Sequence, residues 1–414
     1  MNDRPASRSF PPETQGRKQL IAEARQLAAD RRFGRAVECL NLALEARPDD
    51  SEALKSRGRI LQDASRFEEA MADYQRLVSE SPSDAESWLE LGHCLRALER
   101  LDEAAEAFLR TLELAPHSVE SMVTLGAIDR DREKFESATG WLKKAVAANP
   151  NEVRAHCILG TTYLAAGEAG NGRASLEQAF SLNPYDRTTI AYLYVACCQT
   201  GDAAAALALA QPDILVRSYQ YGEPGTETRL DDSLNERLAD HVRGHSSLEY
   251  ERSGNTTRKG AHTGNLLEAP ATPASQLFEW IEHRIRQYLE SLPRTGTHPY
   301  LAWSPDRWDI DAWGVVIQPG GYQEPHIHPD GWISGVYYVA VPDDIVSADD
   351  SREGCLELGT PPSPFSDCGQ FPVQLLRPRP GKLNIFPSFL WHRTMPYEAS
   401  GERICIAFDV RPRA

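Results

Sequence analysis

Residues 324–339, EPHIHPDGWISGVYYV, place three side chains that can bind a metal ion at alternating positions: His326, His328 and Asp330. The β-branched and aromatic run that follows predicts a strand. Side chains at i and i+2 of a strand point to the same face, so His326 and His328 can contact one ion. Imidazole and carboxylate groups in such sets bind divalent metal ions. The alternative is that these residues bind no metal and that the two histidines lie on the surface beside a turn.

A second stretch supplies the remaining candidates. His392 follows His328 by 64 residues, and Arg403 opens the predicted strand RICIAF eleven residues later. Two ligand sets are then open: His326, His328 and His392, or His328, Asp330 and His392. Pro329 and the Asp-Gly pair after it indicate a turn, which favours the first set by carrying Asp330 out of the strand. The first set lacks a carboxylate to offset the charge of a divalent metal ion.

These blocks resemble the 2-oxoglutarate- and Fe(II)-dependent oxygenases, over roughly residues 300–412. The resemblance is to a bacterial and phage branch with a Pro-His-x-His-Pro…SGVYYV strand and a Phe-Pro-Ser…His…Glu-Arg…Phe ending. It implies a double-stranded β-helix (jelly-roll) domain that binds Fe(II), 2-oxoglutarate and O₂. Arg403 matches the residue that pairs with the distal carboxylate of 2-oxoglutarate, and Cys405 stands where many relatives carry a serine. Tyr322 and Tyr338 could line the cosubstrate pocket.

The resemblance also implies a reaction: oxidative decarboxylation of 2-oxoglutarate to succinate and CO₂, coupled to hydroxylation of a substrate C–H bond. Two other functions stay open. The domain could be a degenerate binding module in a non-catalytic scaffold. A cupin-like isomerase or metal-storage module would use the same histidines but has no need of Arg403.

The first half of the chain repeats itself every 34 residues. Glycines follow this spacing, and so do small residues twelve positions further along each unit. Prolines do so at Pro48, Pro82, Pro116, Pro150 and Pro184. A proline ends each unit because it cannot continue a helix. The period and pattern resemble tetratricopeptide repeats over residues 17–211, which predicts helix pairs stacked into an α-solenoid.

The solenoid is expected to bind a protein or peptide substrate or partner in its concave groove, with a spacer or dimerisation surface as the alternative. Residues 1–16 are predicted to be disordered. The pair of helices before residue 211 is expected to cap the solenoid. We place the second domain at 212–414, with helices flanking the jelly-roll. Residues 257–264 are polar and broken by glycines, which predicts a loop. The whole is an α+β multidomain chain.

Charge and cysteine usage exclude some classes of protein. The net charge of −16, from 60 acidic and 44 basic residues, argues against a nucleic-acid binder, because a phosphate backbone requires a basic surface. No run approaches the ~18–20 apolar residues of a membrane-spanning helix, and no leader sequence is evident at the N-terminus. The eight cysteines form no CxxC pair and read as reduced thiols. A cytoplasmic protein that does not bind membranes is therefore expected.

Overall fold

The computed structural model describes residues 13–222, 233–251, 256–269, 271–293, 298–347 and 351–413. The chain divides into two compact units, residues 1–158 and 159–414. Of the N-terminus expected to be disordered, residues 1–12 lie outside the described part. The first helix, α1 (Glu13–Ala29), already begins at Glu13.

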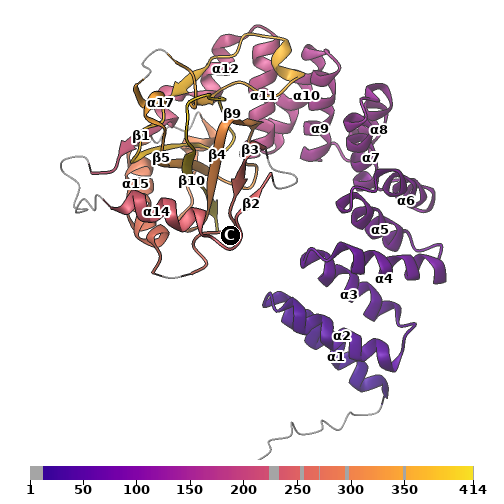
Figure 1. Cartoon of the computed structure of the whole chain (residues 1–414). Helices are drawn as coiled ribbons and strands as arrows, with labels where there is room; N and C mark the ends of the chain where they lie inside the picture. The colour runs from indigo at the N-terminus through magenta and orange to yellow at the C-terminus, as the bar shows by residue number, and fades with distance from the viewer. Residues whose placement is uncertain are drawn as a thin grey trace, which may run out of the picture. The chain divides into compact units, whose positions relative to one another are not determined.

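The first unit is a series of antiparallel helix pairs (Figure 1). After α1 come α2 (Phe33–Ala46), α3 (Ser51–Asp63), α4 (Phe67–Glu80), α5 (Ala85–Ala97), α6 (Leu101–Leu114), α7 (Val119–Asp131) and α8 (Phe135–Ala148). The repeated glycines let the helices of each pair approach closely. A Cβ on Gly58 would lie 2.7 Å from the ring of Tyr74, and one on Gly92 would lie 2.8 Å from the ring of Phe108. The predicted repeat solenoid is confirmed.

The turn inside each helix pair contains one residue with left-handed backbone, and these residues keep the 34-residue spacing. They are Arg31, Ser65, Glu99, Glu133, Gly167 and Gly201. In the first four the φ angle is +56° to +59°, although side chains disfavour this conformation. The last two turns use glycine, which adopts it without strain.

The last repeat helices belong to the second unit. Helix α9 (Val153–Ala165) runs into this unit, and α10 (Ala169–Leu182), α11 (Arg187–Gln199), α12 (Ala203–Ala210) and the short α13 (Pro212–Leu215) follow. Helix α11, which is expected from the sequence to form part of the cap of the solenoid, is buried along most of its length. The Trp391 indole donates a hydrogen bond to the Ala191 carbonyl at 3.1 Å, and Gln199 Nε2 donates to the Phe365 carbonyl at 3.0 Å. Helix α11 is therefore part of the wall of the β-domain.

The β-domain is a curled antiparallel sheet of jelly-roll type. Its strands follow the order β1-β8-β5-β10-β4-β9-β6-β7, with β3 paired to β4 and β2 paired to β3. Their bounds are β1 (Arg217–Gln220), β2 (Glu249–Tyr250), β3 (Thr257–His262), β4 (Trp308–His326), β5 (Ile333–Ala340), β6 (Leu356–Leu358), β7 (Gln374–Leu376), β8 (Lys382–Pro387), β9 (His392–Thr394) and β10 (Arg403–Pro412). The long β4 pairs with β10 through its first half and with β9 near its end, so one strand joins both parts of the sheet.

Two amphipathic helices cover one face of this sheet, α14 (Leu234–Arg243) and α15 (Pro273–Ser291) (Figure 1). Phe278 of α15 packs edge-to-face on Phe408 of β10, with ring centroids 5.5 Å apart. Three short helical segments complete the described part of the domain: α16 (Pro299–Ala302), α17 (Asp343–Ser347) and the 3₁₀ turn η1 (Phe365–Asp367). The predicted loop at 257–264 is wrong. Residues 257–262 form β3, because their backbone groups pair with β4 despite the polar sequence. No helix of the described residues is long and apolar enough to cross a membrane.

Candidate active site

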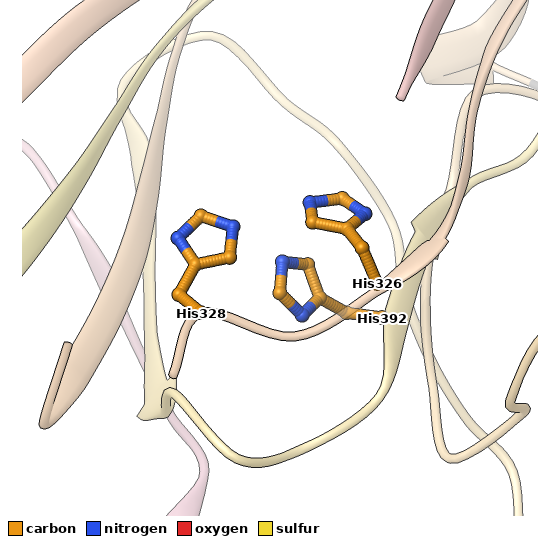
Figure 2. A group of neighbouring side chains, drawn as sticks. All are labelled: His326, His328 and His392. Atoms are coloured by element: carbon orange, nitrogen blue, oxygen red, sulfur yellow. The ribbon is translucent and has the colours of Figure 1, made fainter. Parts of the chain in front are cut away.

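Three histidines from two strand ends come together (Figure 2). His326 ends β4, His328 lies two residues beyond it, and His392 begins β9 opposite His326 in the strand register. One ligand atom from each lies within 4.8 Å of the other two, and the ring centroids of His326 and His392 are 4.2 Å apart. His392 is buried and the other two are half-buried. The spacing fits three ligands of one metal ion.

Each of the three imidazoles forms a hydrogen bond through its Nδ1 atom. His326 Nδ1 lies 2.7 Å from the Glu324 carbonyl, and His392 Nδ1 lies 2.9 Å from the Leu390 carbonyl. A carbonyl only accepts, so both Nδ1 atoms carry the proton and donate it. The Nε2 lone pairs are then free, and Figure 2 shows the rings converging with these edges toward a common centre. Such outer hydrogen bonds fix the tautomer of a metal-binding histidine.

His328 has a different partner, the carboxylate of Asp409 on β10. His328 Nδ1 donates to Asp409 Oδ2 at 2.6 Å, and Asp409 Oδ1 accepts from Ser334 Oγ at 2.7 Å. The ring of Trp313 stacks on the imidazole with centroids 5.7 Å apart. The three-histidine set itself contains no carboxylate, but the Asp409 carboxylate is hydrogen-bonded to one of its members, His328.

Burial keeps two of the histidines neutral. It lowers the pKa of His326 to about 4, with a further contribution from neighbouring His328. Burial and the two adjacent imidazoles hold the pKa of His392 well below its usual value. At neutral pH both rings therefore present a lone pair rather than a proton, which is the state that binds a metal.

Arg403 is a fully buried guanidinium at the start of β10, only 1% exposed. Its Nε has no hydrogen-bond partner, and no carboxylate in the described part of the chain pairs with it. The guanidinium lies over the ring of Tyr338, 4.9 Å from the centroid, and Nη1 contacts Cys405 Sγ at 3.9 Å. Burial raises the pKa of the Tyr338 hydroxyl to about 12, so it stays protonated beside the Arg403 guanidinium. A buried cation in this state calls for an anion from outside the chain.

One cavity of about 670 Å³ joins the histidines to Arg403. Apolar side chains of Val336, Leu356 and Phe386 form part of its wall, with Cys405 beside Arg403. Burial raises the pKa of the Cys405 thiol, which is therefore neutral and a weak hydrogen-bonding group. A metal and a short diacid could occupy this space together.

Two of the residues selected from the sequence lie elsewhere. Asp330 is exposed in the turn closed by the hydrogen bond from Gly331 N to the His328 carbonyl at 3.1 Å, and it is not in the histidine cluster. Tyr322 pairs with Arg258 in the strand register and is not among the residues that line the cavity. Tyr338 reaches the site only through Arg403.

The sequence reasoning missed several contributors. Asp409 could have been found by alternation, since it shares a strand face with Arg403 and Cys405. For Trp313 the sequence alone leaves both a solvated face and a pocket open, without a definite role. Gln323 and Thr394 bond to each other across the cavity wall at 2.8 Å, and Gln323 also donates to Thr257 Oγ1 of β3 at 3.1 Å. These depend on strand pairing that the sequence does not reveal.

Among solved structures, similar proteins include PilW, a type IV pilus biogenesis factor, at 20% identity, covering 52% of this chain and 96% of that one with a TM-score of 0.44. The pilF protein of Pseudomonas aeruginosa is 16% identical, and the match covers 48% of this chain and 90% of that one with a TM-score of 0.42. A thermophilic TPR protein of Thermus thermophilus is 20% identical, and the match covers 44% of this chain and 98% of that one with a TM-score of 0.36. A comparison with curated proteins gave no match.

Three family models match the chain. A tetratricopeptide repeat model matches residues 21–85, and the model of the cilia and flagella-associated protein 70 middle TPR-like domain matches residues 61–183. The model described as "Putative 2OG-Fe(II) oxygenase" matches residues 311–409, a range that holds all three clustered histidines, Arg403 and Asp409. The chain therefore carries tetratricopeptide repeats followed by a C-terminal domain that matches the family described as "Putative 2OG-Fe(II) oxygenase".

Proposed function

We propose that the C-terminal domain is an Fe(II)- and 2-oxoglutarate-dependent dioxygenase that hydroxylates its substrate. His326, His328 and His392 hold the iron through Nε2, and Arg403 holds the distal carboxylate of 2-oxoglutarate. The observation that carries the proposal is one cavity with three outward-anchored imidazoles and a buried guanidinium that lacks an acidic partner among the described residues.

The residues present fit both groups. The three Nδ1 atoms are already hydrogen-bonded, so each ring has only Nε2 to offer an ion. Fe(II), when bound, supplies the activation of O₂ that is coupled to decarboxylation of 2-oxoglutarate. A facial set of three protein ligands leaves positions for the keto acid and for O₂.

The chain's own groups bind, orient and exclude water. Arg403 can pair with a carboxylate through two parallel hydrogen bonds, which fixes the orientation of the diacid. The ring of Tyr338 packs against the guanidinium and supports it. Asp409 and Trp313 hold the plane of the His328 ring, so its lone pair stays directed at the centre. The apolar wall around Val336 and Phe386 keeps water from the reacting groups.

Binding of 2-oxoglutarate tests this directly. We expect calorimetry with Mn(II) in place of Fe(II) to show 2-oxoglutarate binding by the full-length protein, and Arg403→Gln to abolish it. Arg411→Gln is the matched control, because Arg411 lies on the same strand and lines the same cavity but is half exposed. Unchanged binding in a folded Arg403→Gln variant contradicts the proposal.

Release of succinate separates an enzyme from a scaffold. With Fe(II), 2-oxoglutarate and O₂, the enzyme is expected to release succinate, and His392→Ala to stop this. Binding of 2-oxoglutarate without succinate release, even with a captured partner present, would favour the alternative function, a repeat scaffold with a degenerate binding module.

For the repeats, we propose recruitment of a protein or peptide substrate or partner at residues 17–211, which brings it to the oxygenase domain at 212–414 at high local concentration. The expected setting is the cytoplasm, without nucleic acid or membrane. Proteins captured by full-length protein should gain the mass of one oxygen atom only when Fe(II) and 2-oxoglutarate are present. Capture without any such mass change argues against a substrate-recruiting role.

A further inference from the structure

A second cavity of the β-domain, of about 300 Å³, is lined by cationic residues. Arg377 and Arg379 come from the segment between β7 and β8, and Lys382 begins β8. The edge strand β1 contributes Ser218, Tyr219 and Gln220. None of the six is acidic, although acidic residues outnumber basic ones by 60 to 44 in the chain. Three cations at one cavity in an acidic protein require an explanation.

The turn that carries two of these cations is firmly built. Arg379, Pro380, Gly381 and Lys382 form a β-turn in which Lys382 N donates to the Arg379 carbonyl at 3.0 Å. Gly381 has a φ of +79°, the conformation that the third position of a type II turn requires. Three neighbours anchor the turn: Gly381 N bonds to the Tyr338 carbonyl at 2.8 Å, Tyr221 N to the Gly381 carbonyl at 2.7 Å, and Gln220 Nε2 to the Pro380 carbonyl at 2.9 Å. The cations therefore project from a rigid support.

The charge on Lys382 has no carboxylate to balance it among the described residues. Its Nζ donates to the Arg377 carbonyl at 3.0 Å, and the groups that act on it electrostatically are Arg379, Arg377 and the Cys355 thiol. Burial and the two guanidinium groups lower the pKa of Lys382, which means that its charged form is disfavoured as the cavity stands. Among the residues that the structure describes, neither Arg379 nor Lys382 forms an ion pair with an acidic side chain. Behind the cavity, the buried Arg284 lies over the ring of Tyr219 at 5.4 Å.

We propose that this cavity binds the phosphate group of a phosphorylated ligand. The planar guanidinium of Arg379 and the ammonium group of Lys382 together suit a multiply charged tetrahedral oxyanion, which can accept from several donors at once. A nucleic-acid strand does not fit, because the cations are confined to one small cavity in an acidic chain. The site is separate from the residues assigned to 2-oxoglutarate and does not depend on the proposed oxygenase activity.

Calorimetry with inorganic pyrophosphate tests the site on the full-length protein. We expect binding that weakens at rising salt, and a loss of at least tenfold in affinity in the double variant Arg379→Gln/Lys382→Gln. Arg286→Gln is the control, since Arg286 is an exposed cation of the same unit and should bind pyrophosphate as the wild type does. Arg379→Gln alone is expected to weaken binding and, because Arg379 is exposed, should fold normally.

The result that overturns the proposal is equal pyrophosphate affinity in wild type and in the folded variants. Displacement of all pyrophosphate by saturating 2-oxoglutarate would also overturn it, because both would then share the first cavity. Vesicles of equal parts phosphatidylcholine and phosphatidylglycerol distinguish the source of the phosphate. Vesicle binding that the double variant loses assigns a lipid headgroup, and pyrophosphate binding without vesicle binding assigns a soluble ligand.

Discussion

The carboxylate behind His328 gives the most direct test of the proposed metal centre. Asp409→Asn keeps the shape of the side chain and removes its charge. Asp409 accepts two hydrogen bonds, from His328 Nδ1 at 2.6 Å and from Ser334 Oγ at 2.7 Å. An asparagine has one neutral acceptor oxygen and one NH₂ group, so His328 Nδ1 loses its charged acceptor and Ser334 can no longer donate to the second side-chain atom.

The size of the effect follows from the kind of bond removed. A hydrogen bond to a charged group contributes about 1.5–3 kcal/mol, and loss of a partner behind a metal-binding histidine lowers metal affinity by about 10–100-fold. The two estimates agree, since a factor of ten corresponds to about 1.4 kcal/mol. We therefore expect Asp409→Asn to bind Co(II) or Mn(II) about 10–100 times more weakly.

Calorimetric titration of the metal into metal-free protein measures this without any turnover. Asp311→Asn is the matched control, because Asp311 also lines the cavity but pairs with Arg411 rather than with a histidine. Thermal unfolding of the metal-free variants separates a loss of fold from a loss of affinity. If folded Asp409→Asn binds metal within about twofold of wild type, the carboxylate does not support the site and the reasoning toward a charge-compensated three-histidine centre is wrong.

Three further predictions concern stability. Gly167→Ala should destabilise the protein by about 1 kcal/mol because Gly167 has a φ of +79°. Gly170 is an exposed helical residue at which an added Cβ would meet no other atom within 4 Å, so Gly170→Ala should stabilise the protein by about 0.5–1 kcal/mol in urea unfolding. Gly335→Ala places a methyl group against the ring of buried Phe408 and should cost about 1–3 kcal/mol, seen as a lower Tm; an unchanged Tm would mean that the sheet can yield there. Burial lowers the pKa of His298, whose Nε2 donates to a backbone carbonyl at 2.9 Å, so below its usual pKa the unfolded state takes up a proton before the folded state does. Stability should therefore fall as pH drops below about 6.5, and a His298→Gln variant should lose part of that slope in unfolding measured at about pH 7 and about pH 5.

The sequence was most informative where local pattern decides structure. The 34-residue period predicts the helix pairs, and alternation in a strand predicts that His326 and His328 share a face. The turn signal at Pro329 and Asp330 predicts that this aspartate leaves the strand, and Asp330 lies in a turn outside the histidine cluster. Each of these inferences needs only neighbours along the chain.

The rest depends on contacts between distant segments. Asp409 lies 81 residues from His328, and only the pairing of β10 with β4 and β5 brings the two together. Strand β3 has a polar sequence and exists because β4 offers it a free edge. The role of α11 is also hidden in the sequence, since the helix begins 34 residues after α9, as the repeat spacing predicts, although it packs on the β-domain.

The contact between Ala191 and Trp391 has a consequence for synthesis of the chain. The two residues are 200 positions apart, so α11 leaves the ribosome long before the strand segment that covers it. At about 5–20 residues per second the apolar face of this helix waits roughly 10–40 s for its partner. During that interval the nascent protein exposes a helix that the finished molecule buries. The exposed face of α11 is where a chaperone would bind or where aggregation would begin.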